Sequence, residues 1–171
     1  ALGDVCQSMH LFNGKGYVVV NNSHKVVVVD PSTFVATATI TGFDSPRYFL
    51  PVSNSKAYVT DLHANSIAVV DLASNTITGS IHCPGWTEEL VLAYGKAYVT
   101  NETRDKVYVI DTSSDQLTDS ITISMGGNSI VADANGKLWV MCAGASSALY
   151  RIDPVSEQVE GSFTFPNSSD S

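Results

Sequence analysis

The stretch GKAYVTNETRDKVYVID, residues 95–111, decides the fold. It contains two short apolar runs, Ala97–Thr100 and Val107–Ile110, whose valines and tyrosines favour a pleated, half-buried strand. The polar residues between the two runs form a connector of hairpin length. The stretch therefore predicts two antiparallel strands joined by a short loop.

This stretch recurs along the chain, with related copies that begin at Gly14, Ser55 and Gly136. The aromatic anchors of the four copies are Tyr17, Tyr58, Tyr98 and Trp139, spaced by 41, 40 and 41 residues. The closing aspartates are Asp30, Asp71, Asp111 and Asp153, spaced by 41, 40 and 42 residues. Two sets of anchors with the same period indicate an internal repeat.

Each repeat contains four candidate strands and no helical periodicity; in the second repeat they are residues 48–52, 57–60, 66–70 and 76–81. Four-stranded antiparallel units with a period near 40 residues predict an all-β fold, a β-propeller. The strand composition excludes helical repeats of similar period, and the hairpin-length connectors disfavour a solenoid of parallel coils. We expect one propeller segment over residues 1–171, with blades at approximately 4–42, 43–82, 83–123 and 124–165.

The composition narrows the range of functions that the chain could have. The net charge is −8 with nine lysines and arginines, which disfavours binding to nucleic acid. The three cysteines, Cys6, Cys83 and Cys142, form no CxxC pair, so we expect small buried residues rather than disulfides or zinc ligands. No apolar run reaches the ~18 residues of a membrane helix, and the polar opening Ala1–Asp4 does not predict a signal peptide.

The closing aspartates could be catalytic acids or ligands, but we interpret them as turn residues. Each is followed by residues such as Pro31 or Ser113 that favour tight turns, and an aspartate can cap such a turn with its own side chain. The same residue type at the same turn in every repeat indicates a structural role.

The tetrapeptide Tyr98-Val99-Thr100-Asn101 carries a family resemblance, and Tyr58-Val59-Thr60-Asp61 differs from it at one residue. The chain resembles the YVTN family of β-propellers over nearly its whole length. A narrower likeness rests on residues 2–9 (LGDVCQSM), 19–24 (VVNNSH), 40–43 (ITGF) and 45–48 (SPRY). In these segments the chain is similar to surface-layer-type propeller lipoproteins of gut Bacteroidetes.

That resemblance implies an exported protein of the cell envelope, at the outer surface or in the periplasm. Some relatives sit over outer-membrane transporters and capture vitamin B12, which implies cobalamin as a ligand and a transporter as a partner. Relatives have seven blades in roughly twice as many residues. The four repeats are therefore expected to be part of a seven-bladed propeller that further blades or another chain would close.

Aligning the repeats on the aromatic anchors puts Gln7, Arg47, Glu88 and Asn128 at one equivalent position, before the apolar part of each first strand. First strands line the channel of a propeller, so these polar groups either contact a ligand or hydrate the channel through ordered water. The neighbouring loops add Tyr48 and Trp86, and binding sites favour such aromatic residues. We predict a ligand site at these six residues and expect the Glu88 carboxylate to stay hydrated.

Three hypotheses of function follow. The first is a non-enzymatic ligand-binding propeller, and the second is a scaffold that docks a transporter or another envelope protein. The third is a lyase or hydrolase that pairs an acid with a histidine, for instance Glu88 with His63. The sequence has no G-x-S-x-G motif, no histidine pair on a helix and no phosphate-loop lysine, so no catalytic residue, metal or cofactor is predicted.

Overall fold

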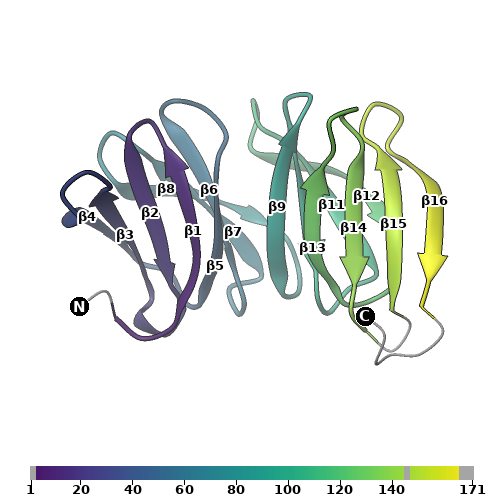
Figure 1. The fold of residues 1–171 in the computed structure, drawn as a ribbon, viewed down its shortest axis with the longest axis horizontal. Coiled ribbons are helices and arrows are strands. Elements are labelled where there is room, and N and C mark those ends of the chain that lie inside the picture. Colours follow the sequence, from purple (N-terminus) through teal and green to yellow (C-terminus); the bar gives the residue numbers. More distant parts are fainter. Residues whose placement is uncertain (1–2, 145–146, 166–171) are drawn as a thin grey trace. The chain divides into compact units, whose positions relative to one another are not determined.

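The computed structural model describes residues 3–144 and 147–165, and nearly all of their regular structure is β-strand (Figure 1). The exception within these residues is one 3₁₀ turn, η1 (Asn21–Ser23). Blade 1 consists of β1 (Cys6–Phe12), β2 (Lys15–Val20), β3 (Lys25–Asp30) and β4 (Val35–Thr41), and blade 2 of β5 (Pro46–Pro51), β6 (Lys56–Asp61), β7 (Ser66–Asp71) and β8 (Thr76–His82). Blade 3 consists of β9 (Thr87–Ala93), β10 (Lys96–Asn101), β11 (Lys106–Asp111) and β12 (Gln116–Thr122), and blade 4 of β13 (Gly127–Ala132), β14 (Leu138–Cys142), β15 (Ala148–Asp153) and β16 (Gln158–Thr164).

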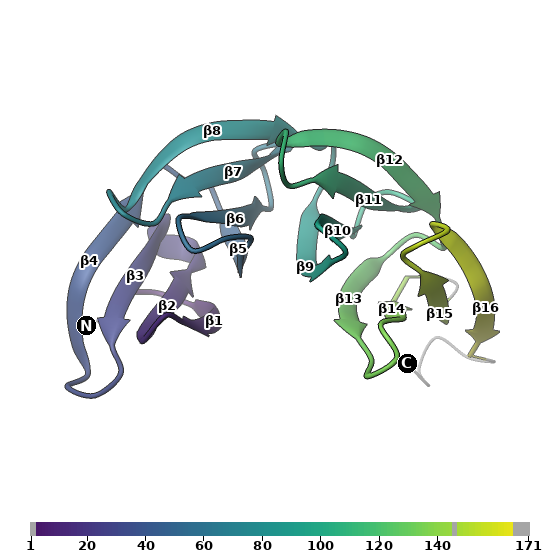
Figure 2. The same ribbon diagram turned by 90° about the horizontal axis from the view of Figure 1, so that it is seen from above.

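Each blade is a four-stranded antiparallel sheet whose strands pair in chain order, from the first strand to the fourth (Figure 2). The predicted fold class, an all-β chain of propeller blades, is confirmed. The aromatic anchors Tyr17, Tyr58, Tyr98 and Trp139 lie on the equivalent strands β2, β6, β10 and β14. The chain divides into two compact units, residues 1–84 with blades 1 and 2, and residues 85–171 with blades 3 and 4.

The core of the first unit lies between blades 1 and 2. The ring of Tyr17 on β2 stacks on Phe49 of β5, with ring centroids 4.3 Å apart and planes inclined by 11°. Aliphatic side chains surround this pair on both blades: Val19, Val26, Val28 and Ile40 from blade 1, and Ala57, Val59, Val70 and Leu72 from blade 2. The aromatic anchor thus faces the next blade in the chain.

The second unit repeats this arrangement between blades 3 and 4. Tyr98 on β10 is fully buried, and its hydroxyl donates to the carbonyl of Pro154 at 2.8 Å. The same core contains Val107, Val109, Ile121 and Ile123 of blade 3 and Ile130, Leu138, Val140 and Ile152 of blade 4. Burial, with a smaller contribution from the charges of Glu157 and Asp153, raises the pKa of Tyr98 to about 12.

The closing aspartates cap the turns between the third and fourth strands, as predicted. The carboxylate of Asp111 accepts the backbone N–H groups of Ser113 and Ser114, both at 2.9 Å. Asp30, Asp71 and Asp153 accept equivalent N–H groups in their own blades. Such hydrogen bonds favour the ionised form, so all four pKa values are lowered. The hydroxyl of Ser113 also donates to Asp111, at 2.6 Å; this bond, followed by those from the two backbone N–H groups, lowers the pKa of Asp111 to about 2.

Tyr98→Ala is expected to lower the free energy of unfolding by about 3–5 kcal/mol, because it empties the space that the ring fills between two blades. Tyr98→Phe keeps the ring and removes only the hydrogen bond to Pro154, so a loss of about 1 kcal/mol is expected. Urea denaturation of the two variants measures both values. Equal losses would show that the hydroxyl, and not ring packing, holds the blades together.

Asp111→Asn is expected to destabilise the protein at neutral pH, and the difference from wild type should shrink as the pH falls. The folded-state pKa of Asp111 is depressed to about 2, so its ionised form stabilises the fold above about pH 4. That stabilisation is lost as the carboxylate is protonated between about pH 4 and pH 2. Urea denaturation from pH 7 to pH 2 tests this, with Asp105→Asn in the exposed loop between β10 and β11 as the control. A difference that persists at pH 2 would contradict the turn-capping role.

Candidate functional site

The predicted polar residues all lie at β-bulges, where the first strand of each blade carries one extra residue. In blade 1, Cys6 pairs with Val20 and Ser8 with Val19, so Gln7 is the additional residue. Equivalent irregularities contain Arg47 with Tyr48 on β5, Glu88 with Glu89 on β9, and Asn128 on β13. A bulge redirects a side chain out of the regular alternation of a strand, and bulges are frequent beside binding sites.

In the first unit the bulges bring two predicted residues together. The Nη1 atom of Arg47 on β5 donates to Oε1 of Gln7 on β1 at 2.9 Å, and both side chains are half-buried. The hydroxyl of Ser8 donates to the carbonyl of Arg47 at 2.7 Å, which holds the two first strands side by side. The backbone N–H of Tyr48 donates to the Thr60 hydroxyl at 3.0 Å. The result is a fixed pair of amide and guanidinium groups supported by both blades.

In the second unit the structure brings Trp86 and Glu88 together. The indole Nε1 of Trp86, just before β9, donates to Oε2 of Glu88 at 2.5 Å. Glu88 is 3% exposed, so the expectation of a hydrated carboxylate is wrong. The bulge turns the Glu88 side chain back toward the indole, which takes the place of water as its hydrogen-bond donor. Asn128 lies half-buried in the bulge of β13.

Glu89 lies outside the six predicted site residues, and the sequence did not predict its contact with the neighbouring blade. Its carboxylate accepts the hydroxyl of Ser129 at 2.9 Å and the backbone N–H of Ile130 at 3.0 Å, so it joins the first strands of blades 3 and 4. Its own backbone N–H donates to the hydroxyl of Thr100 at 3.1 Å. Ser8 plays the matching part in the first unit. No shared residue type marks this position, so the sequence carries no signal for it.

Asp61 fixes the loops beside the bulge of blade 2. It is 3% exposed and its carboxylate accepts four backbone N–H groups. Those of Asp44 (3.0 Å) and Ser45 (2.8 Å) come from the loop before β5, and those of His63 (3.0 Å) and Ala64 (3.2 Å) from the loop after β6. An acid that is so fully bonded to backbone acts as a structural clamp.

Residues 3–144 and 147–165 offer few further groups suited to metal binding or catalysis. They contain no group of three or more His, Cys, Asp or Glu residues that could hold a metal ion. Burial raises the pKa of Cys83 to about 12 and that of Cys142 to about 11, which makes both thiols poor nucleophiles.

Cys6 is exposed, so the expectation that all three cysteines are buried is wrong at this residue, which lies at the start of an edge strand. None of the described helices has the length and apolar character of a membrane span.

Comparison with known proteins gives a family and a fold. A family model described as "Domain of unknown function (DUF5074)" matches residues 1–168. No curated protein matches the chain in sequence. Among solved structures, hydrazine synthase of Kuenenia stuttgartiensis is similar with a TM-score of 0.82 and 18% identity, over 95% of this chain and 48% of its own. Virginiamycin B lyase from Staphylococcus aureus is similar with a TM-score of 0.77 and 15% identity, over 93% and 55%. The dihydro-heme d1 dehydrogenase NirN, solved in complex with DHE, is similar with a TM-score of 0.75 and 12% identity, over 94% and 37%.

At identities of 12–18%, these similarities show a shared fold. The chain spans about half the length of hydrazine synthase (48%) and of virginiamycin B lyase (55%). It spans 37% of the length of NirN.

Glu88→Ala is expected to lower the free energy of unfolding by about 1–3 kcal/mol, because the half-buried indole N–H of Trp86 loses its acceptor. Glu88→Gln keeps an acceptor oxygen, so a loss below about 1 kcal/mol is expected. Denaturant melts of both variants, combined with Trp86→Phe in a double-mutant cycle, isolate this hydrogen bond. If the two substitutions act additively, the bond between Trp86 and Glu88 does not stabilise the loop.

Proposed function

We propose that this chain, which belongs to the DUF5074 family of unknown function, is a non-enzymatic ligand-binding β-propeller of the bacterial cell envelope. Its role would be to capture a corrinoid or a similar nutrient at the outer surface or in the periplasm and to pass it to an outer-membrane transporter. The nutrient, the transporter and the location rest on the resemblance to surface-layer-type propeller lipoproteins. Further blades or another chain would complete the propeller.

The observation that carries the proposal is the variety of polar residues at the bulges. The turn position between the third and fourth strands repeats one residue type, the closing aspartate. The bulge position instead holds glutamine, arginine, glutamate and asparagine in turn: Gln7, Arg47, Glu88 and Asn128. Equivalent positions that hold chemically different side chains are suited to recognising an asymmetric ligand.

The chemistry of each unit suits part of a large polar ligand. In the first unit, the guanidinium of Arg47 is held by Gln7, and such a fixed fork of donors matches carboxylate, phosphate or amide oxygens. In the second unit, the hydrogen bond to Glu88 fixes the indole of Trp86, which offers a flat apolar surface. Amide-bearing edges of a corrinoid match the first kind of contact, and its flat macrocycle matches the second.

The second candidate is a scaffold for an envelope protein, and the third is a lyase or hydrolase. The ligand-binding proposal differs from both because it needs a small-molecule affinity that depends on the bulge residues. We propose no catalytic step. The sequence suggested Glu88 as a candidate catalytic acid, but its carboxylate accepts a hydrogen bond from the indole of Trp86.

Calorimetric titration with cobalamin, and separately with oligosaccharides, tests the proposal. Arg47→Ala is expected to weaken binding about 10–100-fold, because a hydrogen bond to a charged group contributes about 1.5–3 kcal/mol. Arg151→Ala is the matched control: it removes the same charge from the exposed face of β15, far in sequence from the bulges. Tight binding that survives Arg47→Ala, Gln7→Leu and Trp86→Ala would show that the bulge residues are not the site.

A further inference from the structure

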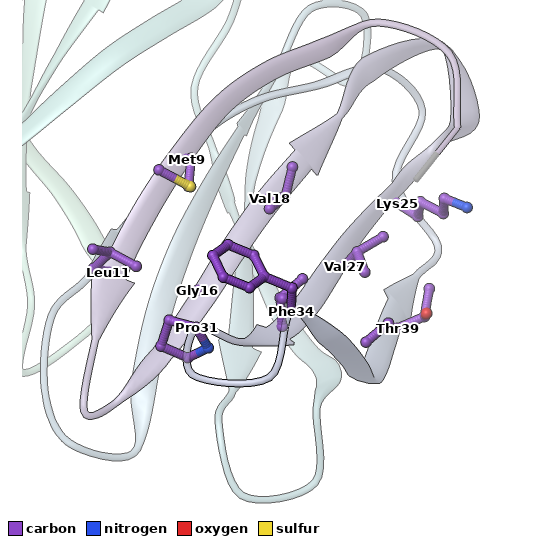
Figure 3. Close-up of a pocket in the computed structure, with 11 residues that line it drawn as sticks. Met9, Leu11, Gly16, Val18, Lys25, Val27, Pro31, Phe34 and Thr39 are labelled. Atoms are coloured by element: carbon purple, nitrogen blue, oxygen red, sulfur yellow. The ribbon is translucent and has the colours of Figure 1, made fainter. Parts of the chain in front are cut away.

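The outer face of blade 1, opposite the face that packs on blade 2, is an apolar surface. Met9, Leu11 and Phe34 are 65%, 63% and 85% exposed on it. With Val18 and Val27 they line an open depression of about 690 Å³, over which the Phe34 ring projects (Figure 3). We call this surface the blade 1 acceptor face and define it by Met9, Leu11, Val18, Val27, Val29 and Phe34.

Both central strands of blade 1 have the sequence of strands buried on two sides. Residues 17–20 of β2 read YVVV and residues 26–29 of β3 read VVVV, without the alternation of a strand with one wet face. Tyr17, Val26 and Val28 point into the core shared with blade 2. Val18 and Val27 are the alternate residues of the same strands, and they lie on the acceptor face.

The repeat shows what covers this position in other blades. By register with the second strand, Met9 and Val18 of blade 1 correspond to Phe49 and Val59 of blade 2. Blade 1 covers these two residues, which are 4% and 0% exposed.

Blade 4 gives the same answer in the second unit. Its residues at the positions of Met9 and Val18 are Ile130 and Val140, which blade 3 covers and which are 2% and 0% exposed. Wherever a unit contains a preceding blade, that blade buries the acceptor face.

The covering face has one composition in both units. It presents a tyrosine from the second strand, two valines from the third and an isoleucine from the fourth: Tyr17, Val26, Val28 and Ile40 in blade 1, and Tyr98, Val107, Val109 and Ile121 in blade 3. We propose that the blade 1 acceptor face docks a further four-stranded blade of this repeat, contributed from outside residues 1–171, with an aromatic ring at the position of Tyr17. This rests on the propeller of the proposed function and not on its ligand.

A second copy that docks through its blade 4 is a poorer occupant. Arg151 stands on that covering face where blades 1 and 3 have Val28 and Val109. The Arg151 guanidinium lies 5.8 Å from the Trp139 ring centroid and pairs with Glu160 at 3.0 Å. Docking would remove this charged pair from water, which costs free energy.

The test supplies a preceding blade. A copy of residues 83–123, which form blade 3 and bury the equivalent face of blade 4, is fused before residue 1 of the 171-residue chain. The added copy brings an acceptor face of its own, with Leu90 and Val99 at the positions of Met9 and Val18, so dye binding is compared with that of a control fusion. We expect the fusion to bind less 1-anilinonaphthalene-8-sulfonate than the control and to unfold at a higher temperature than the unfused chain. The matched control is the same fusion with Tyr98→Asp and Val109→Asp in the added copy alone, which should restore the dye binding.

Two variants of the unfused chain complete the test. Met9→Glu should reduce dye binding without changing the sedimentation coefficient, because the chain alone is expected to be monomeric. If the unfused chain sediments as a dimer that Met9→Glu dissociates, the occupant is a second copy and the proposal is overturned. It is also overturned if the fusion and its Asp control bind the dye equally. Neither readout involves ligand, so this result is independent of the titrations with cobalamin.

Discussion

The packing of one aromatic ring against the next blade is the contact on which the rest of the structure depends. A four-stranded sheet has two faces, and because almost all regular structure of the described residues is strand, the sheets bury a face against one another. Tyr17 stacks on Phe49, and Tyr98 is enclosed by residues of blades 3 and 4. Each of these contacts joins the two blades of one unit. All four repeats carry an aromatic residue at this place, with a period near 40 residues.

In the recurring tetrapeptide of the second strand, Tyr98-Val99-Thr100-Asn101 in blade 3, three of the four residues each have a separate structural role. In blade 3, Tyr98 packs between blades, and the Thr100 hydroxyl bonds both the N–H and the carbonyl of Glu89 in the bulge. Asn101 accepts the backbone N–H of Thr103 and so fixes the following loop. In blade 2, Thr60 and Asp61 perform the last two tasks. The motif therefore supports the bulge and its loops, and the extra residue of the bulge lies outside the motif.

The sequence was sufficient for features that repeat. The strands, the closing turns at Asp30, Asp71, Asp111 and Asp153, and the equivalence of the bulge residues all follow from counting along one period. It was insufficient for features that depend on contacts between chemically different side chains. The burial of Glu88 requires the indole of Trp86 to turn toward it, and the role of Glu89 requires a backbone N–H from the neighbouring blade. The exposure of Cys6 likewise depends on its place at the start of an edge strand, which residue type does not encode.

A bulge explains how a repeat protein can vary its chemistry without losing its fold. The extra residue has no partner in the ladder, so its identity is not constrained by strand pairing. Its neighbours meet the structural demands instead: Ser8 and Glu89 join adjacent first strands, and Thr60 and Thr100 bond the bulged backbone. With those demands met elsewhere, the position can hold Gln7, Arg47, Glu88 or Asn128 in blades that are otherwise alike. Specificity can then be assembled blade by blade on a scaffold whose strand pairing and blade packing come from other residues.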